Sequence, residues 1–255
     1  MQEDTSKKPR LRLPIAKVIS GAFLVPWLKR VRLARALLGS GIALIAIGIY
    51  WAYKGQYLGT WGQIPLVFLY FIVVTPFAIA CHRLVLMADT SVPEYGIVKW
   101  SSREVNFLGK LITVGLASFG AFTLSIMAIG AIVFNLFTIP DIPNNERIHW
   151  LFESFRIPAA YFVARLSLIL PATALDQKSD IRSAWQLSHG NGWRLAVVIC
   201  GLPWLSVILE GYVYPDEPTI VQVTLSCIVF YALLVIEIAL LSLSYKELRS
   251  SGTQP

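Results

Sequence analysis

Among the charged residues inside long hydrophobic stretches of the sequence, three could form a functional site: Arg83, Arg165 and Glu237. A charge at the centre of a membrane helix costs about 2.5–3.5 kcal/mol on insertion scales, so it needs a partner or water. Because the three fall at comparable depth, one hypothesis is that they meet as a buried ion cluster that binds an anion or a lipid headgroup, although the structural interpretation is favoured. In the alternative, structural interpretation, both arginines extend to the headgroups and Glu237 bonds a neighbouring helix.

Four further polar residues in these stretches favour structural roles. Glu153 and Arg156 are three residues apart, so they can pair on one helix. Glu210 is close to the end of its stretch, where the outer loop can solvate it, and Asn135 is placed to bond between helices. A transport or proton-transfer role is the alternative for Glu210.

The sequence contains no complete catalytic arrangement. The patterns H-E-x-x-H, G-x-S-x-G and the P-loop are absent. The three histidines occur in separate contexts: His82, His149 and His189. The three cysteines have no C-x-x-C spacing, which favours small buried hydrophobic residues over a disulfide or zinc site: Cys81, Cys200 and Cys227. We therefore predict no enzymatic activity, no cofactor and no metal site.

The composition is that of a membrane protein. Of 255 residues, 56% are hydrophobic and 15% charged, with a mean hydropathy of +0.62. A hydrocarbon core of roughly 30 Å needs about 20 helical residues, whereas barrel strands would alternate over about ten. The sequence therefore predicts an all-α polytopic membrane protein with about six transmembrane helices, at residues 36–53, 64–88, 107–138, 151–174, 194–214 and 220–245.

The lysines and arginines fall on alternate connecting segments. Nine precede residue 36, four lie in residues 83–110, four in residues 165–194 and two follow residue 245, against Lys54 and Arg147 in the other loops. Because cytoplasmic loops retain Lys and Arg, we predict that both termini are cytoplasmic in a multi-pass protein of the bacterial inner membrane.

A net charge of +7 could indicate nucleic acid, but most of the excess lies in the first 35 residues, beside a predicted span. We predict membrane lipids as partners, together with other membrane proteins or a second copy of the chain, and no nucleic acid. Four cations beside the first span would rest on anionic headgroups, at about 1 kcal/mol each: Lys29, Arg30, Arg32 and Arg35.

A single transmembrane domain is predicted at residues 14–250, between a disordered basic tail at residues 1–13 and a short tail at residues 251–255. It includes amphipathic cytoplasmic helices. Apolar residues recur every three or four positions in residues 14–27, where Pro26 would bend or end the helix.

Two more surface helices are expected between the spans. Ser91 and Glu94 have the spacing of a capping box for a helix that reaches Val105. Ser179 and Asp180 can cap the other helix. Four of its residues face one side, Ile181, Ala184, Trp185 and Ser188, and Gly190 and Gly192 end the turn.

The second and fourth predicted spans share a pattern. Pro76 precedes Arg83 by seven positions, as Pro158 precedes Arg165, and both arginines continue as Arg-Leu-x-Leu. This indicates an internal repeat, and repeats in membrane proteins often form a site at their interface.

The stretch from Arg165 to Leu195 combines Arg-Leu-Ser-Leu-x-x-Pro, Ser-Ala-Trp-Gln-Leu-Ser and Gly-Asn-Gly-Trp-Arg-Leu. It resembles the membrane domain that is fused to glycerophosphoryl diester phosphodiesterases and occurs in related bacterial membrane proteins. The ending Ser244-Tyr-Lys-Glu-Leu-Arg249 is similar too. In those proteins hydrolysis belongs to a separate soluble barrel, which this chain lacks. The resemblance therefore implies membrane topology and no catalytic residue.

Taken together, these patterns favour a noncatalytic envelope component with a binding, assembly or lipid-associated role. The intramembrane charges leave a small transporter or channel-like protein for an anionic substrate as the alternative. A membrane enzyme that acts on lipid is a third hypothesis.

Overall fold

The computed structural model describes residues 12–97, 99–136, 157–213 and 219–252; side chains are not described at residues 56, 60, 129–136, 204–213 and 251–252. All regular structure in these ranges is helical. Most of the predicted N-terminal tail and residues 253–255 lie outside the described ranges, as do His149, Glu153 and Arg156. The side chains of Asn135 and Glu210 fall outside the described part as well.

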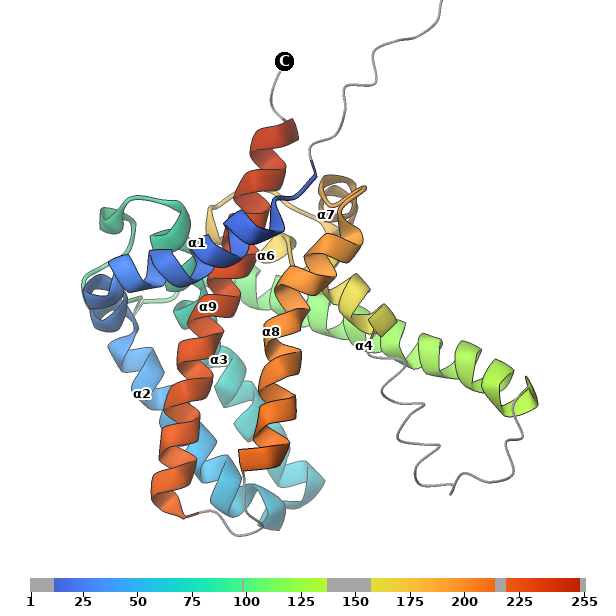
Figure 1. Cartoon of the computed structure of the whole chain (residues 1–255). Helices are drawn as coiled ribbons and strands as arrows, with labels where there is room; N and C mark the ends of the chain where they lie inside the picture. The colour runs from blue at the N-terminus through green and yellow to red at the C-terminus, as the bar shows by residue number, and fades with distance from the viewer. Residues whose placement is uncertain (1–11, 98, 137–156, 214–218, 253–255) are drawn as a thin grey trace, which may run out of the picture.

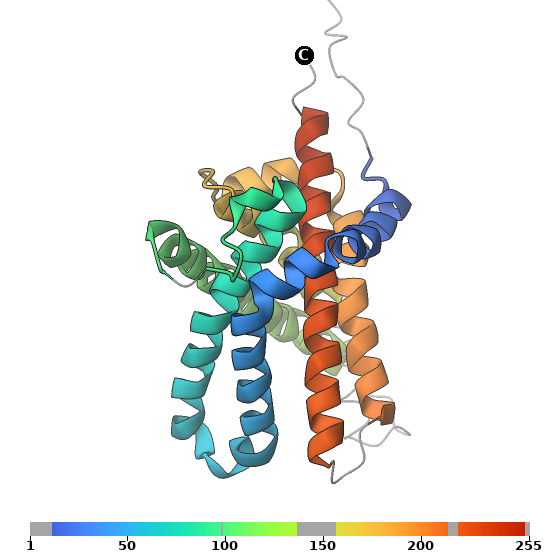
Figure 2. The same ribbon diagram turned by 90° about the vertical axis from the view of Figure 1, so that its left-hand side faces the viewer.

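Four long helices run side by side along one direction (Figures 1 and 2). They are α2 (Arg30–Lys54), α3 (Gly59–Leu86), α8 (Gly192–Val213) and α9 (Ile220–Gly252). A short 3-10 turn, Gly55–Tyr57, joins α2 to α3 as an antiparallel pair. Helix α9 contacts the other three helices of this group and therefore lies at the centre of the packing.

Five helices are long and apolar enough to cross a membrane: Arg30–Lys54, Trp61–Leu86, Ser102–Ala128, Ile157–Ala174 and Ile220–Ser250. They correspond to five of the six predicted spans. The remaining predicted span, residues 194–214, corresponds to α8, which continues to Val213. The side chains of α8 are described only as far as Pro203, so only the apolar part Gly192–Pro203 can be compared with the prediction. The sixth span stays a prediction.

The ends of the bundle differ. The surface helix α1 (Ile15–Leu28), the short helices α6 (Ile169–Ala174) and α7 (Ile181–Leu187) and the C-terminal end of α9 lie at one end, opposite the α2–α3 turn (Figure 1). Helix α1 buries Val18 and Ala22 and packs on α9. Pro26 does not end it at once, because α1 continues to Leu28. The predicted surface helix at residues 14–27 is therefore confirmed as a helix.

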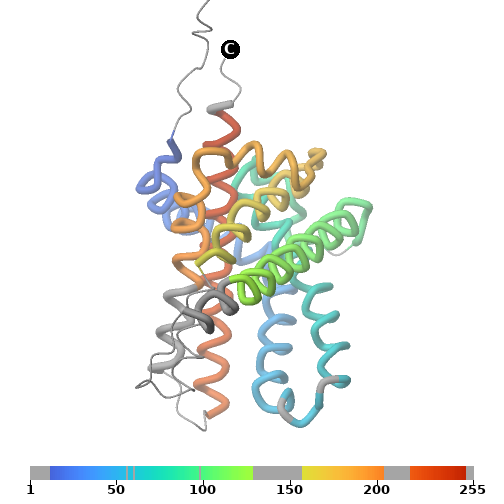
Figure 3. Tube along the Cα trace, turned by 90° about the vertical axis from the view of Figure 1, so that its right-hand side faces the viewer, coloured from blue at the N-terminus to red at the C-terminus, as the bar shows by residue number. Residues whose placement is uncertain are grey.

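Helix α4 (Ser102–Leu136) departs from the direction of the bundle. It runs at a steep angle to α2, α3, α8 and α9 and extends away from them (Figures 1 and 3). In the most apolar 18-residue segment of Ser102–Ala128, only 6% of the residues are buried. Most of the described apolar side chains of α4 are therefore only partly buried or exposed.

The predicted surface helix at residues 91–105 is wrong. After a 3-10 turn at Asp89–Ser91 the chain is irregular until α4 begins at Ser102. The capping box forms ten residues later, where the Ser101 N–H and hydroxyl both donate to Glu104, and the Ser101 hydroxyl accepts from the Arg103 N–H. Both Ser-x-x-Glu pairs match the pattern, so spacing alone did not distinguish them.

Basic residues at the start of α2 hold this irregular segment in place. The ammonium of Lys29 donates to Leu84 O and pairs with Asp89 at 2.7 Å, and Arg32 donates to Asp89 O and Val92 O. Arg35 pairs with the predicted capping residue Glu94 at 2.8 Å. Lys29, Arg32 and Arg35 therefore bind other segments of the chain, and their contact with lipid headgroups stays a prediction.

Gly96 allows the same segment to approach α2 closely. It has a φ of +85°, and a Cβ there would lie 2.2 Å from the backbone oxygen of Ala36. Glycine is the residue that tolerates both the left-handed backbone and the close approach.

The fourth predicted span is interrupted. Residues 157–166 are helical, and the helix resumes as α6 (Ile169–Ala174). Pro171 has no N–H to donate to Ser167 O, and its ring would clash with that carbonyl in a continuous helix. The Leu170 N–H donates to Ser167 O instead, at 2.9 Å.

Helix α7 (Ile181–Leu187) confirms the third predicted surface helix. Asp180 is its N-cap and accepts from the Ser183 N–H at 2.7 Å, while the Ser183 hydroxyl accepts from the Asp180 N–H. Ala184 and Ser188 are buried, and Gly190 follows the helix with a φ of +80°.

Candidate functional site

Arg83 joins three segments of the chain. Its guanidinium donates to Ser91 O at 3.1 Å and to Ala174 O at 3.0 Å, and pairs with Asp176 at 3.0 Å. Asp176 also lies 3.7 Å from Arg103 on α4. The arginine therefore fixes the ends of two connections that are about ninety residues apart in sequence.

Asp176 adopts a backbone conformation that side chains rarely allow. Its φ of +59° makes it the sole positive-φ residue other than glycine in the described part of the chain. Aspartate is among the residues that tolerate this region. The carboxylate is thereby placed between Arg83 and Arg103.

Arg165 has a separate and more local environment. Its buried guanidinium donates to the Ser188 hydroxyl at 2.8 Å, the Tyr161 hydroxyl at 2.8 Å and Trp185 O at 2.7 Å. The guanidinium carbon lies 3.4 Å from the centre of the Trp185 ring, a stacked cation–π contact. Arg165 therefore binds α7 to the helix of residues 157–166.

Glu237 belongs to neither environment. It takes part in none of the ion pairs between described residues. It lies within electrostatic range of Tyr70 on α3 and Cys200 on α8. Arg83, Arg165 and Glu237 therefore lie in three separate environments and do not form the hypothesised ion cluster.

The two stretches that carry the family resemblance meet at Gln177. Its side-chain oxygen accepts from the Tyr245 hydroxyl at 2.5 Å and from Arg249, both on α9. Tyr245 and Leu248 are themselves buried. The C-terminal motif therefore holds the connection between α6 and α7.

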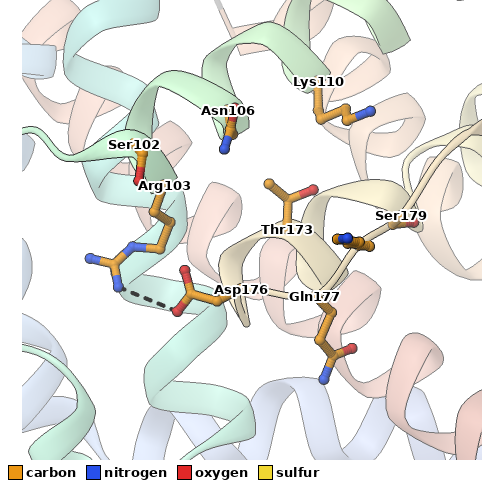
Figure 4. Close-up of a pocket in the computed structure, with 9 residues that line it drawn as sticks. Ser102, Arg103, Asn106, Lys110, Thr173, Asp176, Gln177 and Ser179 are labelled. Carbon is orange, nitrogen blue, oxygen red and sulfur yellow. Dashed lines mark ion pairs between the residues drawn. The ribbon is translucent and has the colours of Figure 1, made fainter.

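A polar cavity of about 360 Å³ lies between α4 and this connection. Figure 4 shows Arg103, Asn106 and Lys110 on α4 across from Thr173 and Asp176. The lining residues are all polar or charged: Ser102, Arg103, Asn106, Lys110, Thr173, Asp176, Gln177, Lys178 and Ser179. The volume is within the range of roughly 300–1,000 Å³ that is usual for ligand sites.

The charges around the cavity are unequal. Three cations line the cavity: Arg103, Lys110 and Lys178. Arg103 pairs with Glu104 at 2.8 Å, and Asp176, the one carboxylate of the lining, pairs with Arg83 at 3.0 Å. Lys110 and Lys178 form no ion pair with any residue that the structure describes. Two ammonium groups and several neutral donors are therefore available to an anion.

The sequence did not lead us to predict this cavity, although the spacing of polar residues at the start of α4 indicates a polar helix face. Arg103, Asn106, Lys110 and Thr113 recur at spacings of three, four and three, which places them on one face of a helix. The predicted site rested on charges deep inside the hydrophobic stretches, whereas these residues lie at the start of one. Their partners come from a connection about seventy residues further along.

Among the described residues outside the long apolar helices, Asp180 is the titratable group whose pKa differs from its ordinary value. Hydrogen bonds from the Ser183 N–H and the Ser183 side chain lower the pKa of its carboxyl. No group of three or more His, Cys, Asp or Glu able to hold a metal ion occurs in the described ranges.

No protein-family model matches the chain, and neither a curated protein nor a solved structure matches it. The resemblance to the membrane domain of glycerophosphoryl diester phosphodiesterases therefore stays a prediction.

Proposed function

We propose that the chain is a multi-pass protein of the bacterial inner membrane, with six spans and both termini in the cytoplasm, and that it binds an anionic group in the polar cavity between α4 and the α6–α7 connection. The role is noncatalytic and lipid-associated. The internal repeat of Pro76–Arg83 and Pro158–Arg165 stays part of this proposal.

The arrangement of the basic segments supports the topology. Five helices are long and apolar enough to span a membrane. Helix α1, the connection after α3, the α6–α7 region and the end of α9 all lie toward the same end (Figure 1). These are the segments that carry most of the lysines and arginines, as cytoplasmic retention requires.

The observation that carries the binding proposal is the pair Lys110 and Lys178. Both line the cavity, and neither is neutralised by an ion pair within the described chain. Three other cations at this end of the bundle, Lys29, Arg35 and Arg83, each form an ion pair. A bound anion would balance the charge of the Lys110 and Lys178 ammonium groups.

The topology is tested with reporters that are active on one side of the membrane, fused to each terminus of the full chain. Both fusions are expected to report the cytoplasm. Opposite reports from the two ends would refute the six-span arrangement.

Binding is tested by measuring the melting temperature of the detergent-solubilised protein against inorganic phosphate, with chloride at the same ionic strength as reference. Phosphate at a hundred times its Kd stabilises by about 2.7 kcal/mol if it binds the folded state alone. The Lys110→Gln/Lys178→Gln variant should lose this stabilisation, whereas Lys246→Gln, on an exposed part of α9, should keep it. Equal stabilisation of both variants would refute the site.

A further inference from the structure

A second cavity continues the first along α4. It is a shallow depression of about 670 Å³ with a mostly apolar lining, formed by α4 and α7. Its lining includes Lys110, Thr113, Ile181 and Trp185. Lys110 lines both cavities, so the first cavity and the mostly apolar second cavity adjoin at this residue.

The two cavities lie along one face of α4. Arg103, Asn106 and Lys110 line the first cavity, and Lys110 and Thr113 line the second. Leu116, three residues after Thr113, is 68% exposed. The same helix face therefore changes from charged to apolar as it leaves the cavities.

The apolar surface extends further along α4. Leu124 and Met127 follow Lys110 and Thr113 by about four turns on the same side of α4, each is 67% exposed, and α4 projects away from the bundle (Figures 1 and 3). In a membrane such a surface contacts acyl chains. An acyl chain along the second cavity can continue directly onto it.

The charges on the second cavity fit the same ligand. Arg182 and Lys110 are cationic and Asp180 is anionic. Asp180 is engaged as the N-cap of α7, where it accepts from the Ser183 N–H. Asp180 lies within electrostatic range of Lys110 and Arg182 but forms an ion pair with neither. Both cations can therefore still contact an anionic headgroup, while Ile181 and Trp185 offer apolar contact.

We propose that the ligand of the polar cavity is the anionic headgroup of a membrane phospholipid, and that one acyl chain of this lipid lies along the second cavity between α4 and α7. This inference rests on the proposed anion site and names its ligand class. A free anion would use the first cavity alone, whereas a phospholipid uses both. The lipid is drawn from the leaflet that faces the basic end of the bundle.

The test compares three probes on the full-length protein in detergent: phosphatidylglycerol, phosphatidylcholine with the same chains, and inorganic phosphate. Phosphatidylglycerol should bind at least about tenfold more tightly than inorganic phosphate, because apolar contact adds to the charge interaction. It should also bind more tightly than phosphatidylcholine, whose headgroup carries no net charge.

Two variants separate the compartments. Lys110→Gln/Lys178→Gln should weaken binding of both phosphatidylglycerol and phosphate. Ile181→Gln should weaken phosphatidylglycerol binding severalfold and leave phosphate binding unchanged, because Ile181 is 46% exposed in the second cavity. Ile19→Gln is the matched control: Ile19 is 38% exposed on α1, on another surface helix at the same end, and the change should affect neither probe.

The outcomes distinguish the two proposals. Phosphate binding that depends on the lysines, without tighter binding of phosphatidylglycerol or any effect of Ile181→Gln, would overturn the phospholipid inference and leave the anion site standing. Lipid binding that is indifferent to headgroup and to the lysines would overturn both, since it would reflect nonspecific contact with the apolar surface.

Discussion

Arg83 and Arg165 show how one sequence pattern serves two structural tasks. Both come seven positions after a proline and begin Arg-Leu-x-Leu. Arg165 finds all its hydrogen-bond partners within residues 161–188, whereas Arg83 reaches Asp176, 93 residues away. The first arginine of the pair thus assembles distant segments, and the second stabilises its own.

The difference comes from the path that the chain takes after each arginine. Helix α3 ends at Leu86, and its connection is held by Lys29 and Arg32 from α2. After Arg165 the helix is interrupted near Pro171, and the chain returns so that Trp185 stacks on the guanidinium. A local motif therefore does not determine its own environment, because its partners come from segments further along the chain.

The largest effect is expected from Arg165→Met. The change leaves Trp185 O and the Ser188 and Tyr161 hydroxyls without their charged donor in a buried site, which should lower the free energy of unfolding by about 3 kcal/mol. Denaturant unfolding in detergent measures it. Arg165→Lys keeps the positive charge but loses the planar set of guanidinium donors, so its free energy of unfolding should lie between those of the wild type and Arg165→Met. An unchanged stability in Met would show that Arg165 is not structural.

Arg83→Met should cost less, about 2 kcal/mol, because the side chain is partly exposed and its partners sit in connections. The same change should increase proteolytic cleavage in residues 87–100 and 175–180. Asp176→Asn tests which contact matters: the ion pair is half-exposed, so it should contribute below about 1 kcal/mol. If Asp176→Asn lowered the free energy of unfolding as much as Arg83→Met, the ion pair would anchor the connection, and the hydrogen bonds to Ser91 O and Ala174 O would not.

The backbone at Asp176 gives a smaller effect that is independent of charge. Asp176→Gly and Asp176→Ala both remove the carboxylate, but alanine is strained at a φ of +59°. The alanine variant should therefore be less stable than the glycine variant by about 1 kcal/mol in the same unfolding measurement. Equal stabilities would indicate that the connection relaxes out of this conformation.

The smallest effect concerns the cap of α7 and pH. The Ser183 N–H lowers the pKa of Asp180 in the folded state, so the cap contributes above the ordinary carboxyl pKa of about 4 and is lost as pH falls through the lower, folded-state pKa. Hydrogen-exchange protection of the α7 amides should decline in that acidic window. Asp180→Asn does not titrate, so an undiminished decline in that variant would assign the effect to another group.

The sequence alone determined the features that depend on local pattern. Apolar length predicted five helices that the structure contains, and the spacing of apolar residues predicted α1. The cap of α7 could be predicted too, since Asp180 and the helix that it begins are adjacent in the chain. These signals are local, so no knowledge of distant contacts was needed.

The tertiary structure decided which of several equivalent signals operates. Ser91 and Ser101 both begin a Ser-x-x-Glu pattern, but Arg35 takes Glu94, so the cap forms at Ser101. It also decided the partners of Arg83, and it brought Lys110 and Lys178 to one cavity. A sequence states which side chains are available, but ion pairs and cavities depend on how elements tens of residues apart pack against each other.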